Sequence, residues 1–477
     1  MEGTALARLR ALWLAHRRAL MVFLLAFAGL AVLSGKQILR TSGNPHFLYM
    51  ADGWLDGRVA LADKPPGYRE RAYDDWAVVR TLELLDGSEV RGLPCSTAEC
   101  KRERSTVQRW WIIGQGWVEL DRRDIVSRKD TWYVSFPPGP AAVMLPFVAV
   151  FGLRTPDILL TLLAGALVPL VLVRLLDRER GTDAGKGREH LWAAAAWTFG
   201  SPAALLAANG RVWFTAQIFG ALFLALYLSA GWRARRPALA GLWLAIAIAC
   251  RPINHLPAIV VFLWFWWRQG RDRRALVAFF APLVIVGIAV AWLNTVRFGD
   301  PFEFGHRFLD VRWQARMQEH GMFALRYLQR NLECLLWLMP TWQSGMPWLR
   351  VSIHGTALWL GSPWIVLAAL ARERFDGRAV LWLAALGSAI PSLFYQNSGQ
   401  IQFSYRFAVD WLPLVLVAIA MGGGLRRRVL APLLVVIAIA VQCWGAWYFA
   451  RAPRKLFVED PMGWPFQDEI DPPARRG

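Results

Sequence analysis

The sequence predicts an all-α polytopic membrane protein in which a large, mixed polar loop follows the first membrane helix. The chain has 477 residues, of which 56% are hydrophobic and 19% charged, and its mean hydropathy is +0.31. A soluble chain of this length carries more charge and divides into domains of roughly 150 residues each. Here, apolar runs of membrane-spanning length recur along the chain, separated by polar segments.

Basic residues are concentrated in the short loops between these apolar runs. The formal net charge is +19, which in a soluble protein would suggest nucleic-acid binding. Arg233, Arg271 and Arg426 instead lie in short loops, which is the distribution found on the cytoplasmic side of membrane proteins. The charge therefore indicates membrane topology, with contact to anionic lipid as a secondary effect. No nucleic-acid partner is predicted.

The N-terminus predicts a membrane anchor. Residues 1–18 are basic and residues 19–34 are apolar, the pattern of a cytoplasmic N-terminus followed by a first transmembrane helix. A cleaved signal peptide is the alternative, but no clear small-x-small cleavage site precedes the polar segment. In both arrangements the next segment lies outside the cytoplasm. We therefore expect a multi-pass plasma (inner) membrane protein whose active face is periplasmic or extracellular.

Residues 35–140 form the large outer loop, where we expect the active site. The start of this loop predicts a short amphipathic helix on the membrane surface. Short strands are expected at 81–93 and 110–120, with Asp86-Gly87 as a hairpin turn. The loop is therefore the part of the chain with mixed secondary structure.

Two cysteines of this loop, Cys95 and Cys100, are predicted to form a disulfide. Their spacing allows pairing, and a non-cytoplasmic compartment permits it. The alternative is half of a zinc site with C-x4-C spacing. It is weaker, because no second pair of cysteine or histidine residues lies nearby.

The rest of the chain alternates between apolar helices and loops. Counting the apolar runs gives about eleven full spans and two short apolar helices, hence eleven to thirteen transmembrane or re-entrant helices. Residues 332–340 are apolar, and we expect them either to dip into the membrane or to pack on the loop. The predicted regions are a transmembrane core at 141–293, a second outer loop at 294–353, C-terminal transmembrane helices at 354–449 and an outer tail at 450–477.

Several catalytic motifs are absent from the sequence. It contains no Walker A phosphate loop, no His-Glu-x-x-His zinc motif and no Gly-x-Ser-x-Gly elbow. The short cytoplasmic loops leave no room for a nucleotide-sugar domain. Any chemistry therefore belongs to the outer face and uses a substrate delivered through the membrane.

Five short motifs, in this order, follow the pattern of a known superfamily. They are Asp74-Asp75 in the large loop and the segments 133–140, 249–252, 294–301 and 405–407. With them, most of the chain resembles the C-type glycosyltransferase superfamily (GT-C fold), especially bacterial relatives of protein O-mannosyltransferases and lipid A aminoarabinose transferases. Many members carry an acidic residue soon after the first helix, where this chain has Asn44 and His46.

This resemblance implies an integral membrane enzyme. Such proteins move a sugar from a polyprenyl-phosphate donor to a lipid, glycan or protein acceptor outside the cytoplasm. The expected partners are then membrane lipid and the polyprenyl-phosphate sugar. The expected reaction is an inverting hexosyl or pentosyl transfer. The alternative is a non-catalytic protein on the same fold, such as a lipid-linked sugar transporter or an envelope assembly factor.

An inverting transfer needs a carboxylate that takes the acceptor proton as the acceptor attacks the anomeric carbon. Asp75 is the predicted general base. Asp74 is the second catalytic candidate, which would orient the acceptor or bind a divalent ion such as Mg²⁺ or Mn²⁺. No other cofactor is expected. The alternative interpretation of the Asp74-Asp75 pair is a solvated turn.

The leaving lipid phosphate needs positive charge around it. Arg406 is favoured for this role because it precedes an apolar helix from the outer side. Alternatives stay open for the others: interfacial packing for His46, snorkelling for Arg251 and a solvated charge run for Lys64 and Arg69. The predicted substrate-binding residues are His46, Lys64, Arg69, Arg251, Tyr405 and Arg406. The neighbouring pair His306-Arg307 is expected to be a solvated loop pair.

Overall fold

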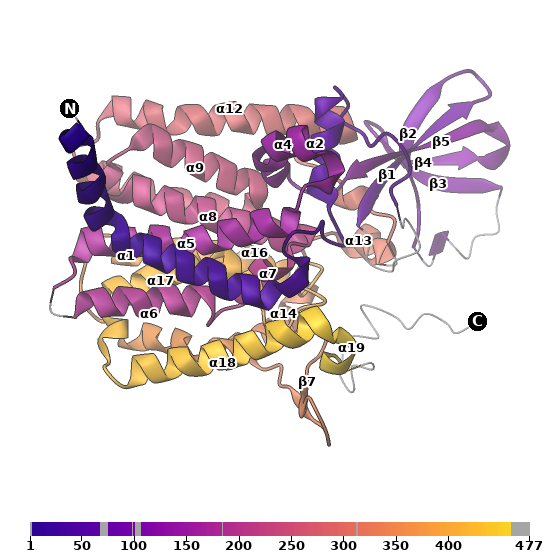
Figure 1. The fold of residues 1–477 in the computed structure, drawn as a ribbon. Helices are drawn as coiled ribbons and strands as arrows, with labels where there is room; N and C mark the ends of the chain where they lie inside the picture. The colour runs from indigo at the N-terminus through magenta and orange to yellow at the C-terminus, as the bar shows by residue number, and fades with distance from the viewer. Residues whose placement is uncertain are drawn as a thin grey trace.

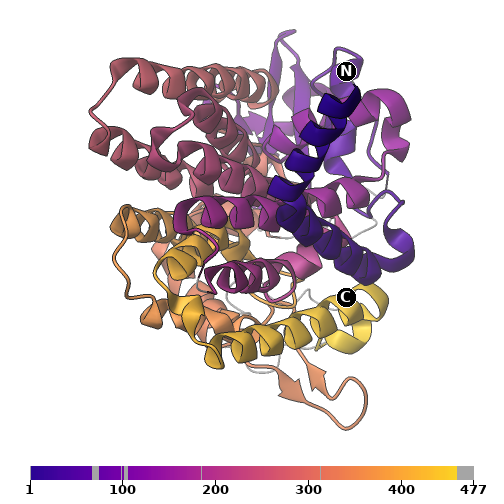
Figure 2. The same cartoon turned by 60° about the vertical axis from the view of Figure 1, so that its left-hand side comes forward.

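The computed structural model describes residues 2–66, 75–97, 99–100, 106–183, 185–311 and 313–458. Most helices run roughly alongside one another in a bundle, and a β-sheet is attached at one end of it (Figure 1). We call this end of the bundle the sheet end and the opposite end the basic end. Figure 2 shows the same bundle from another side, with the N-terminal and C-terminal helices next to each other.

Five helices of the described chain are long and apolar enough to cross a membrane. A sixth crossing is formed if α6 (Lys186–Thr198) and α7 (Ala203–Asn209), which meet at 57°, are counted as one broken span. The chain is therefore an integral membrane protein. The five helices are α1 (Glu2–Ser34), α5 (Asp157–Arg180), α8 (Val212–Gly231), α12 (Arg273–Phe298) and α18 (Leu430–Arg451).

Four shorter apolar helices complete the bundle. One of them, α9, packs between α8 and α12. Several of the expected spans are thus shorter in the structure than the ~20 residues that cross a bilayer unaided. The four are α4 (Gly139–Phe151), α9 (Pro237–Cys250), α16 (Arg378–Phe394) and α17 (Leu412–Met421).

The sheet at one end of the bundle is antiparallel, with the strand order β4-β3-β2-β1-β5. The hairpin between the first two strands turns at Asp86-Gly87, and β1 pairs with β5 through Trp76 opposite Val134. The sequence interpretation missed β5, whose exposed first half carries many charges. The strands are β1 (Trp76–Leu84), β2 (Glu89–Pro94), β3 (Val107–Ile112), β4 (Gly116–Asp121) and β5 (Ile125–Val134).

The sheet is fixed to the end of α12 by an apolar cluster. Ala77, Val79 and Tyr133 of the sheet are buried against Phe298 of α12 and Phe308 of the following loop. The helix ends at Gly299, whose φ of +75° is the left-handed conformation that glycine adopts most easily. At the edge of the sheet, Cys95 and Cys100 form a disulfide with Cα atoms 6.0 Å apart.

The basic end gathers charged side chains from several helices. Arg180 of α5 pairs with Glu189 of α6 at 2.9 Å, and Arg426 pairs with both Glu189 and Glu373. Arg233 pairs with Glu179. Arg233 and Arg426, which the sequence interpretation placed in cytoplasmic loops, thus take part in the ion pairs of this end.

Candidate active site

The first element of the site is Asp75, the residue immediately before β1. Its main-chain oxygen accepts a 2.9 Å hydrogen bond from the hydroxyl of Ser135, at the end of the partner strand β5. Its side chain crosses to the bundle, where Oδ2 accepts a 2.7 Å hydrogen bond from the indole Nε1 of Trp213. Because Trp213 lies in the first turn of α8, the sheet presents this carboxylate to the sheet end of a buried membrane helix.

A buried ion pair forms the second element. Arg251, which follows α9, donates from Nη2 to Asp410 Oδ2 at 2.7 Å and from Nε to both carboxylate oxygens at 3.2 Å. The Asp410 side chain is fully buried, whereas 23% of the Arg251 side chain is exposed. This forked contact is among the strongest that arginine makes. It leaves one edge of the Arg251 side chain accessible.

Arg406 supplies a second buried cation. It begins the short 3₁₀ helix η9 (Arg406–Asp410), and its Nη1 donates to Gln217 Oε1 at 2.8 Å. Gln217 returns the contact by donating to the main-chain oxygen of Arg406 at 2.9 Å. The guanidinium also lies 4.7 Å from the centre of the Phe407 ring, a cation–π distance. Arg406 is therefore held in place without a carboxylate in direct contact among the described residues.

One face of α8 carries the side chains that meet these charges. Trp213, Gln217 and Gly220 are spaced by four and three residues, so they lie on one side of the helix. A Cβ on Gly220 would lie 2.5 Å from His255 Nε2 and 3.3 Å from Arg251 Cγ. This glycine therefore lets Arg251 approach α8. A stripe of Trp, Gln and Gly in an otherwise apolar helix is the sequence signal that could have identified this face.

Tyr395 connects the carboxylate to the two cations. Burial raises the pKa of its hydroxyl, and the negative charge of Asp75 raises it further. Arg251 and Arg406 act in the opposite direction. Asp75 and Asp410 also act electrostatically on Arg406. Arg251 and Arg406 also lie 5.6 and 4.7 Å from the centre of the same Phe407 ring, and one face of α8 holds both Asp75 and Arg406. The four charged side chains therefore form one cluster, which we call the charge cluster: Asp75, Arg251, Arg406 and Asp410.

The expectation of a solvated loop pair agrees with Arg307, which is exposed, but not with His306, which is half-buried. It lies against Phe136 in an edge contact at 5.9 Å. Burial lowers the pKa of its imidazole to about 4, and the charge of Arg251 contributes to this shift. Its neighbour Arg307 stacks on Trp111 with 4.3 Å between guanidinium and ring centre. The loop after α12 is thus folded onto the site and the sheet.

Two buried side chains beside the cluster have polar atoms without a partner in the described part of the chain. Both ring nitrogens of His255 and the hydroxyl of Tyr405 are buried without a hydrogen bond. Buried polar atoms nearly always have partners. Their presence here fits a place that receives a polar ligand or water.

Two of the remaining predicted site residues, His46 and Lys64, lie in the described part of the chain. The His46 ring is wholly buried, stacks on Trp76 at 3.8 Å and has its pKa lowered to about 3 by burial. Its burial against Trp76 agrees with the alternative of interfacial packing, and its role toward a phosphate stays a prediction. Lys64 is exposed. Arg69 and Asp74 lie outside the described residues.

An apolar groove of about 630 Å³ is lined by α4, α9, α12 and residues 54–59, among them Arg58. Its lining includes Ala249, two residues before Arg251 in the sequence. Gly139 of α4 makes the close packing here possible, because a Cβ on it would lie 2.7 Å from the backbone of Ala249. Two lining residues on α12, Ile285 and Trp292, are 67% and 63% exposed. The groove is therefore open to the lipid side of the bundle.

Among the described residues, no group of three or more His, Cys, Asp or Glu side chains is arranged to hold a metal ion. Asp74 lies outside the described residues, so the divalent ion stays a prediction. No family model matches the chain, and no curated protein or solved structure shows significant similarity to it.

Proposed function

We propose that this membrane protein is a glycosyltransferase that moves a sugar from a polyprenyl-phosphate donor to an acceptor. The observation that carries the proposal is a charge cluster at the sheet end of the bundle, with an apolar groove on the helix that leads into it. A carboxylate and two arginines form the cluster, and the groove is lined by Ala249 of α9, two residues before Arg251 in the sequence. A lipid-linked phosphate ester has the matching division into a long apolar chain and a charged head.

In this proposal the donor's prenyl chain lies in the groove and its phosphate reaches the two arginines. Groove residues such as Ile285 and Trp292 supply apolar contact. The partly exposed Arg251 and the carboxylate-free Arg406 neutralise the phosphate as negative charge develops on it. Charge-assisted contacts to phosphate are strong in such buried surroundings.

Asp75 acts as the general base. The acceptor oxygen or nitrogen attacks the anomeric carbon, and its proton passes to a carboxylate oxygen of Asp75. The bond between the anomeric carbon and the phosphate oxygen breaks, and the phosphate leaves with the electron pair. Attack from the face opposite the leaving group inverts the anomeric centre. Trp213 holds Oδ2 through its indole and so orients the carboxylate.

The proposed topology places the sheet end outside the cytoplasm and the basic end inside. The arginine pairs at the basic end support this orientation through the positive-inside tendency. We retain the plasma membrane as the location. We also propose that the chain has the predicted eleven to thirteen transmembrane or re-entrant helices. This number requires the shorter apolar helices to enter the membrane as well.

A second function, a non-catalytic transporter or assembly factor for lipid-linked sugars, is favoured by one observation. Arg251 is already neutralised by Asp410 at 2.7 Å, which weakens its attraction for a phosphate. A protein that releases its lipid after transport benefits from such moderate binding. This function needs no general base, so it predicts that neutralising Asp75 has no effect.

Envelope chemistry distinguishes the two functions. The glycans and glycolipids of a deletion strain are compared by mass spectrometry with those of its parent and of strains complemented by the wild type or by Asp75→Asn. The transferase predicts a missing sugar on one species, restored by the wild type but not by Asp75→Asn. Full restoration by Asp75→Asn would contradict it.

A further inference from the structure

Helix α14 (Leu328–Leu336) has its polar side toward the protein. Arg330 is buried and donates to the main-chain oxygens of Tyr395 at 3.2 Å and Gln396 at 2.8 Å. Asn331 is also buried and donates to the Tyr395 oxygen at 2.8 Å. Surface helices of soluble proteins show the opposite arrangement, with the apolar side buried. The packing of α14 on the protein therefore leaves its apolar side partly uncovered, with Leu328 and Leu332 half-buried.

The uncovered side is a row of leucines. Leu325, just before the helix, and Leu328 and Leu332 within it recur at intervals of three and four residues, which places them on one side. Together with Trp337, and with Gln329 and Glu333 along its polar edge, they line a groove of about 710 Å³. Leu325 is 72% and Trp337 66% exposed. This exposure is unusual for large apolar side chains that form one continuous patch.

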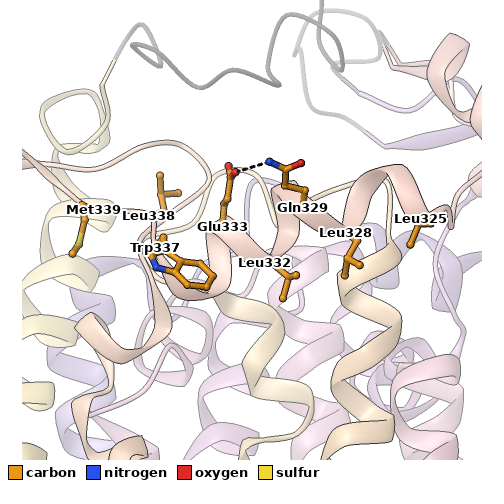
Figure 3. Close-up of a pocket in the computed structure, with 8 residues that line it drawn as sticks. All are labelled: Leu325, Leu328, Gln329, Leu332, Glu333, Trp337, Leu338 and Met339. Carbon is orange, nitrogen blue, oxygen red and sulfur yellow. Dashed lines mark hydrogen bonds between the residues drawn. The ribbon is translucent and has the colours of Figure 1, made fainter.

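A third side of the helix is polar and points away from the leucines. Gln329 and Glu333 extend to the opposite side from Leu328 and Leu332 (Figure 3), and a 3.4 Å hydrogen bond joins the two polar side chains. The leucines point in the direction in which the bundle helices run, whereas the polar pair points beyond their ends. A helix lying along a membrane boundary has this division between hydrocarbon and water.

The hairpin that follows carries tryptophans away from the bundle. Strands β6 (Thr341–Trp342) and β7 (Leu349–Arg350) project sideways from the helices (Figures 1 and 2). Trp342 is 81% and Trp348 57% exposed. At the base of the hairpin, Arg350 donates to the main-chain oxygen of Arg454 at 3.2 Å. Exposed tryptophans beside cations are typical of the headgroup layer of a membrane.

The leucine row also continues a surface that already faces lipid. Helix α14 packs on α16, and the outward side of α16 exposes Leu383, Leu386 and Ile390 by 50% or more. The apolar surface therefore runs from α16 onto α14 without an intervening charged side chain among these residues. This continuity identifies the occupant of the groove as membrane lipid.

We propose that residues 325–350, the boundary segment, lie in the membrane boundary at the sheet end of the bundle. The leucines of α14 contact phospholipid acyl chains, and Trp342 and Trp348 lie among the headgroups. Exposed Arg454 and Lys455 at the base of the hairpin attract anionic headgroups. Arg330 and Asn331 hold the backbone of Tyr395, which lies beside the charge cluster. The depth of the boundary segment in the membrane therefore also sets the depth of the charge cluster in the membrane. This inference does not depend on the proposed reaction.

Fluorescent labels on the two outward sides of α14 test the proposal. The full chain carries Cys443→Ala, which removes the partly exposed free thiol; Cys250 and Cys334 are buried. Leu332→Cys, Leu328→Cys and Gln329→Cys are labelled separately with an environment-sensitive dye in nanodiscs of phosphatidylcholine and phosphatidylglycerol. Elution as a single peak in size-exclusion chromatography selects the folded variants.

The expected result is opposite quenching of neighbouring sites. Labels at 328 and 332 should emit at shorter wavelength and be quenched by nitroxide on lipid acyl chains, whereas the label at 329 should be quenched by aqueous iodide. Equal quenching of 329 and 332 by iodide would place both sides in water and overturn the proposal. Protection of 328 and 332 from both quenchers would show a protein occupant and overturn it equally.

Discussion

The indole nitrogen of Trp213 donates a 2.7 Å hydrogen bond to Oδ2 of Asp75, across 138 residues of sequence. The contact links the only described residue of the Asp74-Asp75 pair to the helix that also holds Arg406 through Gln217. One helix face thus positions both the proposed base and one proposed phosphate ligand.

Trp213→Phe should lower kcat while leaving binding of polyprenyl phosphate unchanged. The substitution keeps the aromatic ring and removes the N–H that orients the carboxylate. Hydrogen bonds to charged groups contribute about 1.5–3 kcal/mol, so a loss of roughly tenfold or more in kcat is expected. Steady-state kinetics and lipid binding on the same preparation check it. Parallel losses in kcat and lipid binding would indicate a structural role for Trp213 instead.

Arg406→Ala should weaken the binding of polyprenyl phosphate, and Arg406→Lys should restore only part of it. Lysine cannot reproduce the forked contacts of a guanidinium. A lost charge-assisted contact of about 2 kcal/mol corresponds to roughly thirtyfold in Kd. Titration with a fluorescent polyprenyl phosphate measures the effect. Arg428→Ala, which removes an exposed arginine at the basic end, is the matched control, and equal affinity in both alanine variants would refute the assignment.

Gly139→Ala should destabilise the protein, because the added Cβ would lie 2.7 Å from the Ala249 backbone. Forcing extra volume into close packing costs about 1–3 kcal/mol. Gly287→Ala is the control, since Gly287 has no atom within 4 Å of its added Cβ. Thermal unfolding in detergent should show a lower Tm for Gly139→Ala than for Gly287→Ala. An unchanged Tm at position 139 would mean that α4 and α9 separate easily.

The orientation of the chain in the membrane is tested by labelling single cysteines in intact cells with a reagent that does not cross the membrane. Cysteines introduced at Asp300 and Gln400 should react, whereas cysteines introduced at Arg233, Arg271 and Arg426 should react only after permeabilisation. Arg233 and Arg426 take part in the ion pairs of the basic end. Labelling of the Arg271 position in unpermeabilised cells would contradict the proposed orientation.

The sequence predicts the membrane class well because hydrocarbon imposes long apolar helices, and α5, α8 and α12 follow the expected runs. It predicts the β1–β2 hairpin because Asp86-Gly87 has strong local turn chemistry. The start of α17 is harder to predict: the residues before it form the 3₁₀ helix η9 (Arg406–Asp410), whose contacts with α8 a local pattern does not contain.

The charge cluster is only partly predictable from the sequence, because its members come from segments that lie far apart along the chain. Arg251 and Arg406 stand out as charges beside apolar runs. Asp410 and Tyr395 become partners only when distant segments meet at the sheet end. For His46 the sequence leaves a ligand role and a packing role open, and the fold places its ring against Trp76 and Phe136.

The proposed transferase depends most directly on Asp75. Asp75→Asn keeps the size of the side chain and its contact with Trp213 but removes its basicity, so the protein should fold and lose activity. Loss of a general base typically costs about 100- to 10,000-fold in rate. Asp86→Asn, an exposed aspartate in the β1–β2 turn, is the matched control with an expected parental rate.

The decisive measurement is the turnover of purified, folded Asp75→Asn with its lipid donor, beside the wild type, Asp74→Asn and the double variant. We predict that Asp75→Asn falls within the range for a lost general base and that Asp74→Asn has a milder effect. Near-parental turnover in both single variants and in the double variant would contradict the account and favour the non-catalytic function.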